Sequence, residues 1–132
     1  MSFHERLRQV WRSKNSLVCV GIDPEVAKIP AHLHDEEEPY LAFGTGIVDA
    51  TAPYVSAFKP QAAHFAAVGA EDQLAKLIAY IQRNYPEIPV ILDAKRGDVG
   101  STAALYAKEV FERFGADAVT VSPYLGLSLI HI

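Results

Sequence analysis

The 132-residue sequence has little cysteine and no long hydrophobic run, and each shortage excludes a class of protein. Cys19 is the only cysteine, so no internal disulfide can form, and a reducing compartment such as the cytoplasm fits best. No apolar run reaches the roughly 18 residues that a membrane span needs. Charged residues interrupt residues 1–15, where a secretory signal would carry its apolar segment. The sequence therefore predicts a cytoplasmic protein with no membrane partner.

Basic charge and glycine-rich loops are also scarce. The formal net charge is −4, which offers no basic surface for nucleic acid, so no nucleic-acid partner is expected. The first strongly apolar run is followed by GIDPEV (residues 21–26), which lacks the G-x-G-x-x-G spacing of a dinucleotide-binding turn. A dinucleotide fold is therefore disfavoured.

Short apolar runs alternate four times with helical patterns. We expect strands at residues 16–22, 55–59, 89–93 and 118–121, the second stopping at Pro60, and Cys19 buried in the first. Apolar runs of this kind are typical of parallel strands covered by helices. An open doubly wound sheet and a (β/α)8 barrel both fit this pattern. A barrel needs eight strands and typically about 250 residues, so four strands make half of one.

Helical spacing is clearest between the expected strands. Leu74, Leu77, Ile78 and Ile81 recur on one face of a helix that ends near Asn84. Three further helices are expected. The one at the N-terminus has Phe3, Leu7, Val10 and Trp11 on one face, and the one at residues 40–52 has Leu41, Ile47 and Val48 in the core. The third, at residues 101–114, has Leu105 and Phe111 in its apolar stripe and Gly115 at its end. Residues 24–39 are broken by prolines and are expected to form a loop.

Charged side chains gather where the third expected strand ends. Asp93 and Lys95 are two residues apart, so they project from the same face of the strand at its carboxyl end. In a barrel this end is the catalytic face. Two buried charges need partners, and Lys59 at another strand end and Asp98 just beyond the third strand are the candidates. We therefore expect an alternating array of two lysines and two aspartates.

The segment LDAKRGDVGSTA (residues 92–103) resembles the signature of orotidine 5′-monophosphate decarboxylases, and in particular their longer bacterial branch. The resemblance extends through VGIDP (residues 20–24), FKPQAAHF (58–65) and VTVSPYLG (119–126), and so covers essentially the whole chain up to Gly126. It implies an α/β fold, a parallel (β/α)8 TIM barrel of which this chain supplies about the first four β/α units. It also implies decarboxylation of orotidine 5′-monophosphate to UMP in de novo pyrimidine synthesis.

The resemblance also implies a role for each matching residue. Lys95 is the expected proton donor to carbon six of the pyrimidine, and Lys59 and Asp93 belong to the charged network, with Lys59 also near the ribose. Asp23 is expected to bind a ribose hydroxyl. Asp98 and Thr102 are expected to reach into the site of a neighbouring subunit, which makes the active form a homodimer. No metal and no organic cofactor are expected.

Other interpretations stay open at this point. A sugar-phosphate decarboxylase or aldolase of the same barrel superfamily shares the shorter D-x-K-x-x-D core, and a half-barrel acting only as a binding module is a third possibility. His32 and His34 precede an acidic run that is expected to be a solvated loop rather than a metal site. For His64, a packing role and a ligand contact are equally consistent with its position.

The last six residues, LSLIHI (127–132), do not continue the family pattern. They are what CTGTCTCTTATACACATC encodes, a transposon end used as an adapter in sequencing libraries. We therefore expect residues 1–126 to be the N-terminal half of one barrel domain and residues 127–132 to be non-native. By this interpretation the isolated chain lacks the family's phosphate-binding arginine, and it is expected to be poorly soluble and inactive.

Overall fold

Four short parallel strands form the centre of the structure, a computed structural model that describes residues 1–125. The strands are β1 (Cys19–Ile22), β2 (Ala57–Pro60), β3 (Ile91–Arg96) and β4 (Ala118–Val121). β1 pairs with β2 and β3 pairs with β4, and the single bridges Phe58–Val90 and Gln61–Asp93 join the two pairs. The strand order therefore follows the chain order, and the expected parallel sheet is confirmed.

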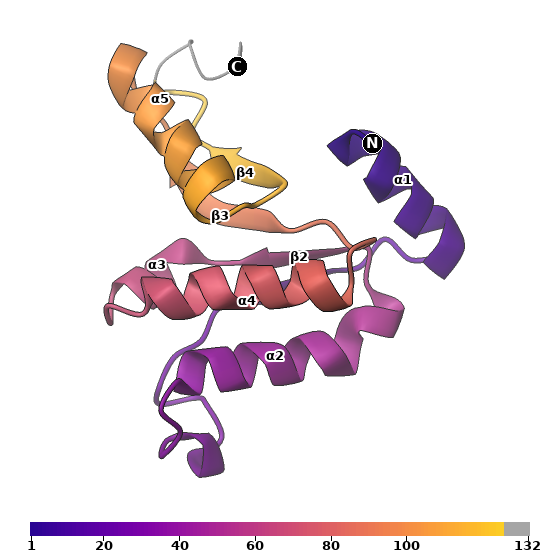
Figure 1. The fold of residues 1–132 in the computed structure, drawn as a ribbon, viewed down its shortest axis with the longest axis vertical. Helices are drawn as coiled ribbons and strands as arrows, with labels where there is room; N and C mark the ends of the chain where they lie inside the picture. Colours follow the sequence, from indigo (N-terminus) through magenta and orange to yellow (C-terminus); the bar gives the residue numbers. More distant parts are fainter. Residues whose placement is uncertain (126–132) are drawn as a thin grey trace.

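Helices connect the strands and cover their outer side. They are α1 (Phe3–Lys14), α2 (Pro39–Thr51), α3 (Ala62–Ala66), α4 (Glu71–Asn84) and α5 (Gly100–Lys108), with short 3-10 helices η1 (Ala31–Leu33) and η2 (Ala52–Tyr54) and a π-helix η3 (Glu109–Arg113). Figure 1 shows α2 and α4 side by side beneath β2, and α5 beside the pair formed by β3 and β4. Among the described residues, no helix is long and apolar enough to cross a membrane.

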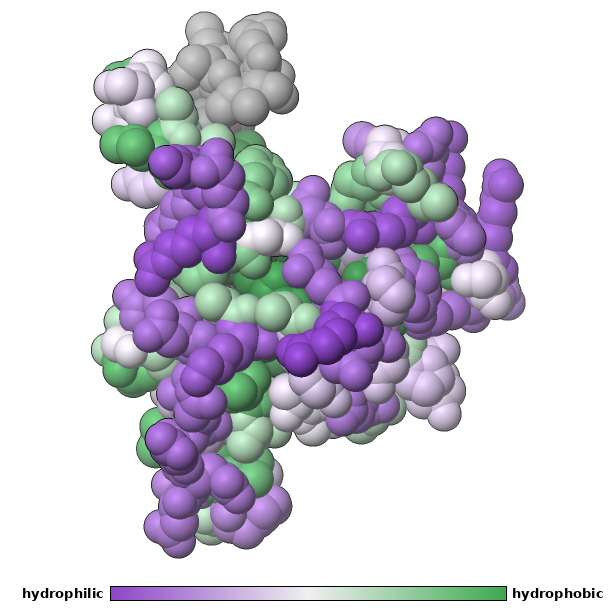
Figure 2. Space-filling model, viewed as in Figure 1, coloured by the Kyte–Doolittle hydropathy of each residue, from purple (hydrophilic) through white to green (hydrophobic). Residues whose placement is uncertain are grey.

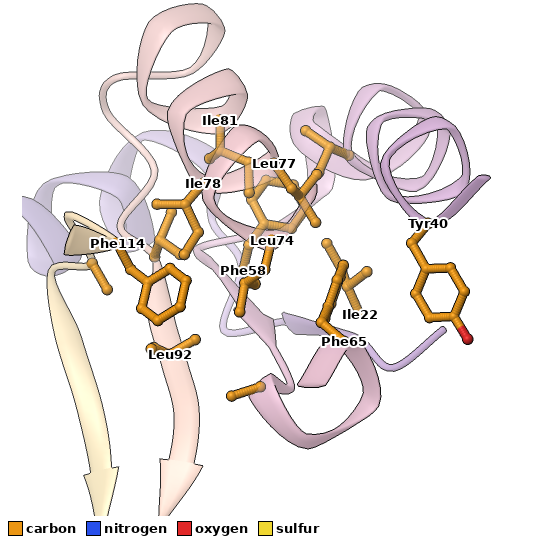
Figure 3. Packing of buried hydrophobic residues seen from close by; sticks show 14 of the residues in the cluster. Ile22, Tyr40, Phe58, Phe65, Leu74, Leu77, Ile78, Ile81, Leu92 and Phe114 are labelled. Atoms are coloured by element: carbon orange, nitrogen blue, oxygen red, sulfur yellow. The ribbon is translucent and has the colours of Figure 1, made fainter. Parts of the chain in front are cut away.

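Helix α4 supplies the middle of the hydrophobic core. Its predicted apolar face is confirmed, because Leu74, Leu77, Ile78 and Ile81 are fully buried. Figure 3 shows these side chains pointing toward Phe58 of β2. Burial of each such side chain contributes about 1.5–3 kcal/mol, so this face is a main source of the stability of the fold. Acidic residues in the first turn of α4 and a basic residue in its last turn also suit the helix dipole.

Helix α2 approaches α4 closely at Gly44. A Cβ atom at Gly44 would lie 2.8 Å from a methyl group of the fully buried Leu77, whereas a Cβ at Gly46, on the same helix, would meet nothing within 4 Å. We expect Gly44→Ala to lower the free energy of unfolding by about 1–3 kcal/mol through overpacking. The matched change Gly46→Ala is expected to raise it by about 0.5–1 kcal/mol, because alanine favours the helix. Urea denaturation of a full-length enzyme that carries this segment checks both values, and equal effects would contradict this packing.

The helix expected at residues 101–114 differs from the observed structure. The α-helix ends at Lys108 and continues as the π-helix η3, and the expected apolar stripe is wrong, because Leu105 is 66% and Phe111 is 45% exposed. The buried residues are Ala103 and Val110 instead. Position 105 lies about 200° around the helix from position 103, so it faces outward. The wider π turn then changes the face on which later side chains lie. Figure 2 shows hydrophobic residues on the surface over α5.

The first strand is also shorter and more exposed than expected. It begins at Cys19 rather than Ser16, and Cys19, expected to be buried, is exposed. Leu17 and Val18 before it are 78% and 53% exposed. Within the described residues β1 pairs only with β2, so its outer edge is uncovered, and only Ile22 at its end is buried among the helices. The expected burial of Cys19 and of the start of this strand is therefore wrong.

The remaining boundaries shift by a few residues. β2 includes Pro60 instead of stopping before it, and β3 runs on to Arg96 instead of ending at Asp93. The expected loop at residues 24–39 contains the short helix η1, and α2 has Leu41 and Ile47 partly buried against the core with Val48 fully buried. In α1 only Val10 is buried, and Trp11 is 38% exposed. The proposed boundary at residues 126 and 127 lies outside the described residues.

Candidate active site

The carboxylate of Asp93 is the centre of the candidate site and accepts hydrogen bonds from four side chains. Lys59 Nζ and Gln61 Nε2 donate to Oδ2 at 2.8 and 3.1 Å. Lys95 Nζ and Thr120 Oγ1 donate to Oδ1 at 2.8 and 2.7 Å. These residues lie at or near the carboxyl ends of β2, β3 and β4, which is the catalytic face in a parallel barrel.

Asp93 is a buried charge that its partners keep ionised. The residue is only 6% exposed, and this burial by itself raises the pKa of the carboxyl group. Hydrogen bonds from Lys59, Lys95 and Thr120 outweigh burial, so the pKa of Asp93 lies well below its ordinary value. In turn, the hydrogen bond to Asp93 raises the pKa of Lys59, and the charge of Asp23 adds to this effect. The site therefore holds a carboxylate between two ammonium groups.

Lys95 has an unusual backbone conformation. Its φ is +48°, in the left-handed region that non-glycine residues rarely adopt. Such a conformation costs roughly 1–3 kcal/mol and persists only where the surroundings impose it, most often at functional sites. The side chain is 66% exposed, although Nζ is paired with the buried Asp93. The ammonium group is thus held by its partner and still open to a molecule on the catalytic face.

The other predicted residues lie around this centre. Asp23 is exposed just after β1 and is near enough to Lys59 to affect its pKa. Asp98 is partly buried beyond β3, and its carboxylate accepts a hydrogen bond from the backbone N–H of Val99 at 2.8 Å. Thr102 is exposed in the first turn of α5. Of the expected four-charge array, the described contacts join Lys59, Asp93 and Lys95.

Two residues of the site were missed in the sequence. Gln61 and Thr120 both donate to Asp93, yet both are uncharged and carry no strong signal. The spacing of Gln61, two residues after Lys59, was the available sign, since alternate residues share a face of a strand. Thr120 lies within an apolar strand and gave no comparable sign. His64 has its Nδ1 atom 3.1 Å from the carbonyl oxygen of Pro24, a hydrogen-bond contact within the protein.

Within residues 1–125 no group of three or more histidine, cysteine, aspartate or glutamate side chains is placed to hold a metal ion. His34, one of the two histidines before the acidic run, has its Nε2 atom 2.9 Å from the carbonyl oxygen of Ile29.

Comparison with known proteins places the chain in a family. The family model described as orotidine 5′-phosphate decarboxylase / HUMPS family matches residues 16–131. The chain belongs to this family. The orotidine 5′-phosphate decarboxylase of Ralstonia nicotianae is 61% identical over 126 residues, which are 96% of this chain and 46% of that protein. That of Janthinobacterium is 53% identical over 130 residues, 98% of this chain and 48% of that protein.

Solved structures of the orotidine 5′-phosphate decarboxylase family agree with the fold. A decarboxylase structure from Toxoplasma gondii matches with a TM-score of 0.89 and 36% identity, covering 98% of this chain and 44% of that one. One from Streptomyces avermitilis matches with a TM-score of 0.83 and 35% identity, covering 98% and 47%. The expected fold class is confirmed: the chain forms part of a TIM barrel. It spans about half the length of the curated relatives that it matches.

The lowered pKa of Asp93 makes a prediction about acid stability. A carboxyl group whose pKa is lowered on folding contributes stability that is fully present above its unfolded pKa of about 3.9 and is lost as the pH falls below it. We expect Asp93→Asn to lower the free energy of unfolding by roughly 2–4 kcal/mol at neutral pH, because two ammonium groups lose their partner. The difference in the free energy of unfolding between the parent and Asp93→Asn is expected to shrink as the pH falls from 5 to 3. Urea denaturation across this pH range, on a full-length enzyme that carries this segment, checks it, and a constant difference would contradict the assignment.

Proposed function

We propose that the enzyme to which this chain contributes decarboxylates orotidine 5′-monophosphate to UMP. The observation that carries the proposal is the buried Asp93 carboxylate held between the ammonium groups of Lys59 and Lys95 at the carboxyl ends of two parallel strands. It occurs in a chain that is 61% identical to a relative named orotidine 5′-phosphate decarboxylase. No observation favours the alternative of a sugar-phosphate decarboxylase or aldolase.

The chemistry of this reaction needs a fixed cation. When the bond between carbon six and the carboxylate breaks, CO2 leaves and the electron pair stays on carbon six, which has no conjugated sink. An ammonium group held beside that carbon stabilises the developing negative charge, most strongly where water is excluded. The proposed sequence ends when Lys95 Nζ gives a proton to carbon six and then regains one from solvent. Overall, one proton is consumed for each CO2 released.

The neighbours of Lys95 have supporting roles in this proposal. Asp93 is ionised and pairs with Lys95 Nζ at 2.8 Å, which favours the charged ammonium form that the proton transfer needs. Lys59 pairs with the other oxygen of Asp93 and lies on β2, toward β1 and Asp23. We assign Lys59 and Asp23 to the ribose of the substrate. Neither a metal nor an organic cofactor enters this sequence of steps.

We further propose that two copies of the enzyme complete each other's sites. Asp98 and Thr102 follow β3, in the loop and first turn of α5, where they lie partly or fully exposed. Val99 between them is 68% exposed, although valine is among the residues most often buried. In this arrangement Asp98 and Thr102 of one copy face the substrate bound to Lys59 and Lys95 of the other. The partner is thus a second copy of the same enzyme.

A chimera tests the function directly. Residues 1–125 of this chain replace the matching segment of the Ralstonia nicotianae relative, and CO2 release from carboxyl-labelled orotidine 5′-monophosphate is measured with the purified protein. We expect turnover typical of an enzyme, with kcat of about 1 s⁻¹ or more. A folded chimera, monodisperse and with a cooperative unfolding transition, that released no CO2 would contradict the proposal.

A further inference from the structure

The pairing between β3 and β4 is irregular beside the catalytic lysine. Leu92 pairs with Val119 and Arg96 pairs with Val121, with a register shift between them. Three residues of β3 therefore face one residue of β4, Thr120. An extra length of this kind is typical of a β-bulge, which locally disrupts the hydrogen bonds between two strands. The backbone N–H of Lys95 is bound by a side chain instead, at 3.0 Å from Thr120 Oγ1.

The directions of the two hydrogen bonds at Thr120 are determined by chemistry. A hydroxyl group has one proton to donate and lone pairs to accept with. The backbone N–H of Lys95 can only donate, so Oγ1 accepts from it. The ionised carboxylate of Asp93 can only accept, so the hydroxyl proton goes to Oδ1 at 2.7 Å. Thr120 thus links the backbone of Lys95 to the carboxylate that binds the side chain of Lys95.

This link meets Lys95 at the point where its backbone is left-handed. The Lys95 ammonium group is tied to Asp93 Oδ1 at 2.8 Å, and its backbone N–H is tied to the same oxygen through the Thr120 hydroxyl. We propose that Thr120 is a positioning residue, which sets the backbone of Lys95 and orients Asp93 so that the ammonium group stays at the reacting carbon. This inference rests on the proposed decarboxylation.

The substitution Thr120→Val tests the link, because valine keeps the shape of threonine and removes both hydrogen bonds. In the chimera we expect kcat to fall roughly 10- to 100-fold, as for the loss of one hydrogen bond to a charged group. KM is expected to stay within about threefold, since the hydroxyl is satisfied inside the protein and its loss acts on the chemical step. Thr120→Ser keeps the hydroxyl and is expected to restore kcat to within about threefold of the parent chimera.

Thr51→Val is the matched control. The Thr51 hydroxyl donates to the carbonyl oxygen of Ile47 at 2.7 Å within α2, so this change also removes one hydrogen bond of a partly buried threonine. Its kcat is expected to equal that of the parent. A purely structural role for Thr120 would lower stability in the same way as Thr51→Val and leave kcat per folded site unchanged. Parental kcat in Thr120→Val, or failure of Thr120→Ser to restore kcat, would overturn the inference.

A crystal structure of the Thr120→Val chimera provides a readout that does not depend on activity. We expect φ of Lys95 to return to negative values. If φ stays near +48° and the Asp93–Lys95 contact is unchanged, Thr120 does not position Lys95, whatever the kinetics. If the parent chimera releases no CO2 at all, the proposed function fails, while the backbone conformation of Lys95 in the variant still decides whether Thr120 sets it.

Discussion

Replacing Lys95 with alanine in the chimera is expected to lower kcat/KM for orotidine 5′-monophosphate by roughly 10⁵-fold. Two losses combine in this variant. Removal of a positioned general acid typically costs about 10²–10⁴-fold, and removal of a fixed charge at the site of developing charge costs a further 10²–10³-fold. The measurement is steady-state decarboxylation, followed by CO2 release, on protein whose cooperative unfolding shows that it is folded.

Lys108→Ala is the matched control for the loss of a lysine. Lys108 on α5 is 68% exposed and lies 4.0 Å from Glu112, while Lys95 is 66% exposed and 2.8 Å from Asp93. An exposed ion pair of this kind contributes about 1 kcal/mol or less, so Lys108→Ala is expected to leave both stability and kcat/KM unchanged. If Lys95→Ala behaved like Lys108→Ala, Lys95 would have no part in the reaction.

The second large effect concerns Asp98. We expect Asp98→Ala to lower kcat/KM by about 10²–10³-fold, because it removes a charge from the site of the other subunit. In a mixed dimer, the Lys95→Ala of one copy and the Asp98→Ala of the other copy then fall in the same site. One site carries both substitutions and the other carries neither. Mixing the two inactive proteins in equal amounts, under conditions that exchange subunits, is expected to restore about a quarter of the parental activity.

The mixing experiment distinguishes a shared site from a site within one chain. If Asp98 acts on Lys95 of its own chain, every site in every mixed dimer carries one substitution, and mixing restores nothing. Recovery must also depend on subunit exchange, so proteins mixed without exchange are expected to stay inactive. Native mass spectrometry shows whether the subunits have exchanged. If activity does not recover after exchange, Asp98 does not act across the interface, and the proposed chemistry at Lys95 is unaffected.

Much of the fold could be predicted from the sequence because its patterns are local. The face formed by Leu74, Leu77, Ile78 and Ile81 repeats at helical spacing, and all four residues are buried as predicted. The charges at Lys59, Asp93 and Lys95 were predicted to meet because they end parallel strands, and they do. Patterns of this kind depend only on how side chains alternate along a strand or around a helix.

The differences arose where long-range pairing decides the outcome. The bulge at Lys95 depends on how β3 and β4 pair, and the exposure of Cys19 depends on which edge of the sheet is covered. The π turn after Lys108 also left no sign in the helical spacing of the sequence. Thr120 was missed for the same reason as the bulge. A threonine in an apolar strand carries no sign of the carboxylate that it meets 27 residues away, because only the register of the two strands brings them together.

The central claim is that the Lys95 ammonium group, held by Asp93, exchanges a proton with carbon six of the pyrimidine. Any step that delivers this proton must also remove it in the reverse direction. The direct test is to incubate the chimera with UMP in D2O and follow deuterium at carbon six by NMR. We predict exchange with the parent chimera and none above background with Lys95→Ala. Equal exchange in both proteins would contradict the claim.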